Sequence, residues 1–146
     1  MSKQRMSRRL RRLVRERAQG CCEYCLSQEA YATQGFSVEH ITPEDVGSGS
    51  AADNLALACQ GCNNFKYNKT SARDPGSRQI VPLFHPRQQH WHEHFAWNHD
   101  CTLIIGLTPT GRATVEALHL NRPGVLNLRH LLLLIGRHPP QPHVSA

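Results

Sequence analysis

Two short cysteine pairs are the residues of this sequence that point most directly to chemistry. Cys22 and Cys25 form one C-x-x-C pair, and Cys59 and Cys62 form another. This spacing lets two thiolates of a pair bind one tetrahedral ion, and four sulfur ligands with no open position are typical of structural zinc. Two buried or redox-active pairs are the alternative. The sequence therefore predicts one structural Zn²⁺ held by four cysteines.

The interval between the cysteine pairs, with the residues just after it, carries polar side chains suited to phosphodiester hydrolysis. Glu39 and His40 end an alternating apolar-polar run, Asn54 begins a second run, and Asn63 and Lys66 follow the last cysteine. Hydrolysis needs a base to deprotonate water and a hard cation to neutralise charge on the leaving oxygen. The interval offers a candidate for each role. A turn residue at 54, a helix N-cap at 63 and a solvated lysine at 66 are the alternatives.

The elements that would position these residues follow from hydrophobic periodicity and from Gly and Pro. Around the cysteine pairs we expect an amphipathic helix over 4–19 ended by Gly20, strands over 36–41 and 54–59 joined by a loop over 43–53, and the start of a helix over 63–68. Beyond Thr70 we expect a loop over 71–80, a helix over 87–97, a strand over 102–106, and helices over 111–120 and 124–137.

The chain length and its 39% apolar content favour one domain with a modest core. Within it we expect a basic helix over 1–20, a zinc-braced core over 21–70, an α/β extension over 71–137 and a disordered tail over 138–146.

The motifs of the central segment resemble those of the HNH endonuclease family. The resemblance rests on C-x-x-C, then acidic-His-Ile-x-Pro, then Asp-Asn-Leu, then C-x-x-C-Asn-x-x-Lys. It implies an α+β fold, in which a ββα-metal core is braced by a four-cysteine zinc site and flanked by helices.

Roles for individual residues are also implied by the resemblance. His40 would be the general base, Asn54 the asparagine that steadies the loop carrying it, and Asn63 a ligand of a catalytic Mg²⁺ or Mn²⁺ ion. Glu39 would be the acidic ligand beside the histidine, and Lys66 a lysine that faces phosphate. The family usually has Asp at the position of Glu39, and this departure bears on the geometry of the metal.

The resemblance continues beyond the central motifs. Four further segments look like those of a compact bacterial subgroup of HNH proteins, namely residues 83–87, 91–95, 111–115 and 118–121. The histidines near residue 90 belong to these segments, and we interpret them as packing residues.

Positive charge gathers at the N-terminal end of the chain. The formal net charge is +6, and eight of the seventeen Lys and Arg residues lie in the first twenty positions. A local basic patch is typical of a surface that contacts phosphate backbones, so we expect DNA contacts from Arg8, Arg9, Arg11 and Arg12, with Lys66 as a further contact. A solvated helix face and a cleavable transit peptide are the alternatives for this helix.

Composition also bears on the compartment. No secretory apolar segment follows the basic residues and no run approaches the length of a membrane span, so we expect a reducing cytoplasm with Cys21 and Cys101 as free thiols.

Three functions fit these observations. The first is a metal-dependent endonuclease acting on DNA, with RNA as an alternative substrate. The second is a zinc-containing nucleic-acid-binding module with impaired catalysis, and the third is a zinc domain that binds a protein partner. The sequence does not determine the oligomeric state.

Overall fold

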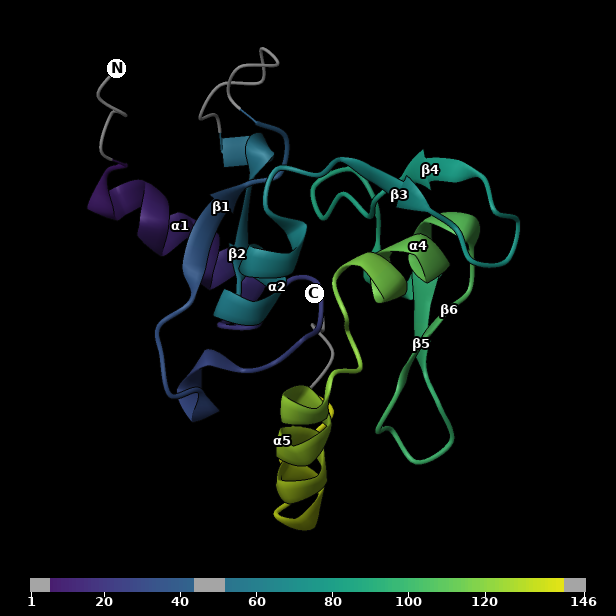
Figure 1. The fold of residues 1–146 in the computed structure, drawn as a ribbon. Coiled ribbons are helices and arrows are strands. Elements are labelled where there is room, and N and C mark those ends of the chain that lie inside the picture. The colour runs from purple at the N-terminus through teal and green to yellow at the C-terminus, as the bar shows by residue number, and fades with distance from the viewer. Residues whose placement is uncertain (1–5, 44–51, 141–146) are drawn as a thin grey trace.

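A computed structural model of the chain describes residues 6–43 and 52–140. The fold is α+β, with short antiparallel strand pairs and helices (Figure 1). None of the helices in these two ranges is long and apolar enough to cross a membrane.

A β-hairpin and a helix form the centre of the N-terminal half. Strand β1 (Ser37–His40) pairs antiparallel with β2 (Leu55–Ala58), and His40 lies opposite Leu55. Helix α2 (Gln60–Lys66) follows at once and packs on both strands (Figure 1). The whole of β2 is buried, which explains its uniformly apolar sequence. The predicted strand–strand–helix order is confirmed, although α2 begins before residue 63 and takes in Cys62.

Helix α1 (Arg8–Ala18) packs on β2 through its apolar stripe. Ser7 caps its first turn by accepting a hydrogen bond from the Leu10 amide at 3.1 Å. Val14 is fully buried, and Met6, Leu10 and Ala18 pack around the same core. The amphipathic pattern therefore predicted this helix correctly, while residues 1–5 lie outside the described part of the chain.

Two further hairpins and three helices make up the C-terminal half (Figure 1). Its elements are β3 (Ser71–Arg73), β4 (Ile80–Pro82), α3 (Trp91–His94), β5 (Phe95–Trp97), β6 (Ile104–Gly106), α4 (Pro109–Ala117) and α5 (Pro123–Leu134). β3 pairs with β4, and β5 pairs with β6, both antiparallel. The expected strand near 102–106 and both expected late helices are present with shifted ends.

Two expectations for this half are wrong. Residues 71–80 are not only a loop, because their first and last residues belong to the β3–β4 hairpin. The helix expected over 87–97 is a single turn, α3, after which the chain enters β5. Both errors have one cause: strands of three residues are too short to show a period, and they form only because tertiary partners complete them.

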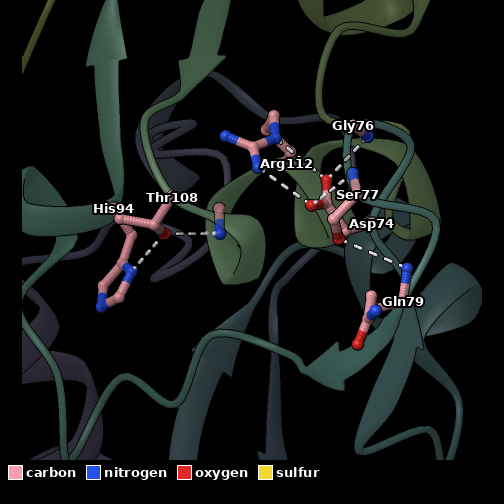
Figure 2. A network of polar contacts seen from close by, with 8 residues as sticks. Asp74, Gly76, Ser77, Gln79, His94, Thr108 and Arg112 are labelled. Carbon is pink, nitrogen blue, oxygen red and sulfur yellow. Dashed lines mark hydrogen bonds and ion pairs between the residues drawn. The ribbon is translucent and has the colours of Figure 1, made fainter.

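A buried carboxylate organises the turn between β3 and β4 (Figure 2). Asp74 accepts hydrogen bonds from the amides of Gly76 and Ser77, both at 3.0 Å, and a bidentate pair from Arg112 with both distances 2.9 Å. On α4, Thr108 caps the helix through the Gly111 amide and also contacts Nδ1 of His94. A Cβ at Gly111 would collide with the His94 carbonyl. Gly111 therefore lets α4 approach the backbone at His94 closely.

One hydrophobic cluster joins the two halves of the molecule. It runs from Val14 and the cysteines through β2 to Phe84, Phe95 and Leu120. Residues 141–146 of the expected disordered tail lie outside the described ranges, but His138 is buried and contacts the Cys101 carbonyl at 2.8 Å.

Candidate functional site

The four cysteines of the two C-x-x-C pairs come together in the interior. The Sγ atoms of Cys22, Cys25, Cys59 and Cys62 all lie within 4.8 Å of one another, and all four residues are buried. The first pair lies after α1, while Cys59 caps α2 and Cys62 lies in its first turn. Among the described residues this is the only group of three or more His, Cys, Asp or Glu side chains that could hold a metal ion.

The geometry of this cluster fits zinc. A tetrahedral ion with Zn–S bonds of about 2.3 Å separates its sulfur atoms by about 3.8 Å. Cys25 Sγ lies 3.7 Å from Cys59 Sγ, which is that separation and is too long for a disulfide. Hydrogen bonds from the other three thiols hold the pKa of the Cys59 thiol far below its ordinary value. A stabilised thiolate is the form that binds metal. Cys21 lies outside the cluster, with its Sγ 3.6 Å from the Gln19 carbonyl.

His40 lies at the end of the β1–β2 hairpin where the connecting loop begins, and Asn54 holds the turn that follows it. The Asn54 carbonyl accepts from the Ile41 amide at 2.9 Å. Its side-chain amide accepts from the Thr42 amide at 3.0 Å and donates to the Thr42 carbonyl at 2.9 Å. These three bonds fix the backbone directly after His40. Asn54 thus positions the backbone of Ile41 and Thr42.

Glu39 points toward α2 and is almost fully buried. Its Oε1 accepts from the Tyr24 hydroxyl at 2.6 Å, and its Oε2 lies 3.5 Å from Lys66 Nζ. Lys66 is itself 1% exposed and donates to the Ile41 carbonyl at 2.8 Å. We expected Lys66 to face phosphate, but the structure buries it. Its ammonium lies beneath the hairpin as the partner of Glu39.

Burial dominates the protonation chemistry of this group. It raises the pKa of the Glu39 carboxyl, although Lys66 and Tyr24 favour the charged form and oppose the rise. Burial and the charge of Glu39 both raise the pKa of the Tyr24 hydroxyl, which stays a neutral donor. The glutamate and lysine thus form a buried ion pair supported by two further hydrogen bonds.

Breaking this pair is expected to destabilise the fold strongly. Replacing Glu39 with Ala leaves the Lys66 ammonium buried without its counter-ion, which costs on the order of 3–5 kcal/mol. Replacing Glu39 with Gln and Lys66 with Met together removes both charges and should recover most of that loss. Urea denaturation of Glu39→Gln, Lys66→Met and the double variant measures the coupling between the two side chains, with Glu39→Ala measured beside them.

The exposed Glu116 on α4 provides the matched control, since Glu116→Ala should change the free energy of unfolding by less than about 0.5 kcal/mol. Equal, small effects of Glu39→Ala and Glu116→Ala would show that the buried pair is not formed in solution.

Asn63 lies inside α2, one turn before Lys66, and is half-buried. Because Cys59 is the N-cap of this helix, Asn63 does not cap it. Its position on the helix that faces Glu39 keeps it a candidate ligand.

The arginines predicted to contact nucleic acid lie on the exposed surface of α1. Arg8, Arg9, Arg11 and Arg12 are all exposed. Arg17, at the end of the same helix, is different, because its Nη2 donates to the carbonyl of Leu55, the cross-strand partner of His40. Helix α1 therefore has exposed arginines on its outer surface and, at its C-terminal end, one arginine that contacts the β1–β2 hairpin.

Three residues near this site had no role in it predicted from the sequence. Tyr24 lies inside the first C-x-x-C pair, and only the fold shows that it contacts Glu39. Burial lowers the pKa of His85, and the charges of Lys66 and Asp53 both act on it, so the segment after β4 reaches the same end of the hairpin. Arg87 in that segment pairs with Glu23 of the first cysteine knuckle. No short sequence pattern predicts such long-range contacts.

The fold and site together define a ββα unit braced by four cysteines. Residues 22–69 match the model of the family described as HNH endonuclease. The match covers about a third of the chain, begins at the first cysteine of the cluster and ends just beyond α2. This segment is therefore similar to the HNH endonuclease family over the cysteine-braced ββα unit. Comparisons with curated proteins and with solved structures found no significant match.

Proposed function

We propose that this protein is a metal-dependent endonuclease that hydrolyses phosphodiester bonds of DNA, with His40 as the general base. The observation that carries the proposal is the placement of His40 within the family-matched segment. It ends β1, and Asn54 fixes the turn that follows with three hydrogen bonds. A base held in this way can take a proton from an attacking water without first ordering its own loop.

Glu39 and Asn63 are the residues that would hold the divalent ion, Mg²⁺ or Mn²⁺. The ion would supply charge neutralisation at the leaving oxygen. Glu39 offers the carboxylate that such an ion prefers, but Lys66 lies 3.5 Å from one of its oxygens. Binding therefore requires the ion to share Glu39 with Lys66 or to displace it, and the cleavage assay with each ion tests this.

A nucleic-acid-binding module without catalysis is the second candidate. The Glu39–Lys66 ion pair favours it, since an ammonium already neutralises the carboxylate that would bind the ion. Both candidates use the basic surface of α1.

Incubation of the zinc-loaded protein with supercoiled plasmid separates the candidates. Cleavage that requires added Mg²⁺ or Mn²⁺ supports the endonuclease. Intact plasmid with retarded mobility supports the binding module, and plasmid unchanged in both respects supports a zinc domain for a protein partner. His40→Ala protein purified in parallel controls for a contaminating nuclease.

Neutralising the basic helix is expected to weaken DNA binding to a similar extent for all sequences. With Arg8, Arg9, Arg11 and Arg12 changed to Gln, the slope of log K against log salt should flatten by up to about one unit for each phosphate that the helix no longer neutralises. Fluorescence anisotropy with two unrelated duplexes over a salt series measures this slope.

The control removes exposed arginines elsewhere on the molecule, at positions 73, 78 and 137. We compare the change in the slope of log K against log salt, divided by the number of arginines removed, between the α1 variant and this control. Equal values would show that α1 is not the contact surface.

A further inference from the structure

The guanidinium of Arg122, between α4 and α5, lies against the second cysteine pair. Its Nη2 is 3.2 Å from Cys59 Sγ, and its Nη1 is 3.6 Å from Cys62 Sγ. These distances are within hydrogen-bonding range for sulfur. Arg122 lies far outside the family-matched segment, so the C-terminal half supplies this contact.

Three other groups hold the guanidinium in place. Nη1 also donates to the carbonyls of Leu118 and His119, at 3.4 and 3.1 Å. The guanidinium carbon lies 5.8 Å from the centre of the Phe65 ring on α2, a cation–π distance. The side chain is thus oriented by groups that are not cysteines.

Gly61, between Cys59 and Cys62, makes room for this approach. A Cβ at Gly61 would lie 2.5 Å from Arg122 Nη2, closer than any ordinary contact. Glycine leaves this space to the guanidinium, and a side chain at position 61 would have to displace it. The residue type inside the second C-x-x-C pair is therefore explained by an arginine about sixty positions later.

Charge gives the contact its chemical meaning. Four thiolates around one Zn²⁺ carry a net charge of −2, and burying that charge is costly unless cations lie nearby. Arg122 touches two of the sulfurs, and the buried Arg129 on α5 lies within electrostatic reach of the same cluster. Two positive charges from the C-terminal half thus balance the site.

We propose that Arg122 is a positioning residue of the zinc site, which donates N–H···S hydrogen bonds to the Cys59 and Cys62 thiolates and couples the C-terminal half to the metal. Hydrogen bonds to metal-bound thiolates withdraw electron density from sulfur and orient it, and such outer contacts tune metal affinity. The inference needs the zinc site alone and stands whether or not the protein cleaves DNA.

Zinc affinity of the full chain provides the first test. Arg122→Met keeps an unbranched apolar stem but removes the guanidinium with its charge and donors. It should weaken zinc binding by on the order of 10-fold or more, measured by competition with a chelator of known affinity. Arg122→Lys keeps the charge but lacks the planar fork of the guanidinium, so its zinc affinity should lie between those of the wild type and Arg122→Met. Arg137→Met, at an exposed arginine, should match the wild type.

Gly61→Ala tests the same contact from the cysteine side. Its methyl group should push the guanidinium away and weaken zinc binding, while in Gly61→Ala/Arg122→Met there is no guanidinium to displace. The double variant should therefore bind zinc no more weakly than Arg122→Met alone. Fully additive effects of the two substitutions would overturn the coupling, as would wild-type affinity in Arg122→Met.

Cobalt substitution separates this role from simple packing. When Co²⁺ replaces zinc, weaker N–H···S bonding should move the sulfur-to-cobalt charge-transfer band to longer wavelength in Arg122→Lys, which lacks the two-pronged fork, and in Gly61→Ala, which displaces it. A packing defect lowers stability but leaves that band in place. An unmoved band in both variants would overturn the proposal, even if Arg122→Met failed to fold.

Discussion

Replacing His40 with Ala is expected to lower metal-dependent plasmid cleavage by about 10²-fold or more, as for loss of a general base. The fold should survive, because the Asn54 clamp on the following turn uses backbone groups of Ile41 and Thr42 and none of the imidazole. Zinc content and DNA affinity should also be unchanged, because the imidazole belongs neither to the cysteine cluster nor to α1. Initial rates of supercoiled plasmid loss, at matched zinc content, measure the effect.

His99 provides the matched control, since it is an exposed histidine in the turn between β5 and β6. His99→Ala should cleave at the wild-type rate. Cleavage by His40→Ala at the rate of His99→Ala would remove His40 from the catalytic role and leave the binding module as the better description.

Loss of one cysteine ligand is expected to abolish both zinc binding and cooperative folding. Cys59→Ser removes a thiolate that lies 3.7 Å from Cys25 Sγ, at the residue that precedes α2. Structural zinc contributes about 10–16 kcal/mol of apparent binding free energy in small zinc domains, which is comparable to or larger than the whole stability of a domain this size. Metal analysis of purified protein should give one zinc per wild-type chain and none in the variant, whose thermal transition should be broad.

Cys101→Ser provides the control for thiol replacement, because Cys101 is half-buried outside the cluster. It should keep the metal and a sharp unfolding transition. Folded wild-type protein without zinc, or an oxidised Cys25–Cys59 pair in it, would contradict the structural-zinc assignment.

The zinc site links these predictions to the architecture. Arg122 contacts the cysteines directly, and Gln28 beside the first pair donates to the Arg137 carbonyl at 2.7 Å. Zinc loss should therefore loosen the C-terminal half as well as the family-matched segment. Within the described residues, buried apolar side chains of the C-terminal half such as Phe84, Phe95 and Leu120 belong to the same hydrophobic cluster as the cysteines. The two halves are therefore expected to unfold together.

Sequence alone determined the parts of this protein whose signal is local. Cysteine spacing predicted the four-sulfur cluster, because two residues between ligands set the bite on one ion regardless of the rest of the chain. The period of apolar residues predicted α1, and the two short runs next to the cysteines predicted the positions of β1 and β2. The half-buried alternation expected of the strands is wrong, because β2 is buried throughout and the buried residue of β1 is Glu39.

Only the tertiary structure decided which polar groups face each other. The motif around Lys66 predicts a cation for phosphate, yet the packing of α2 against β1 buries this lysine against Glu39, with Tyr24 as a third partner. Gly61 and Arg122 meet for the same reason, although no pattern joins them in the sequence. Contacts across sixty residues depend on how helices and hairpins pack, and packing is a property of the whole core that no short segment encodes.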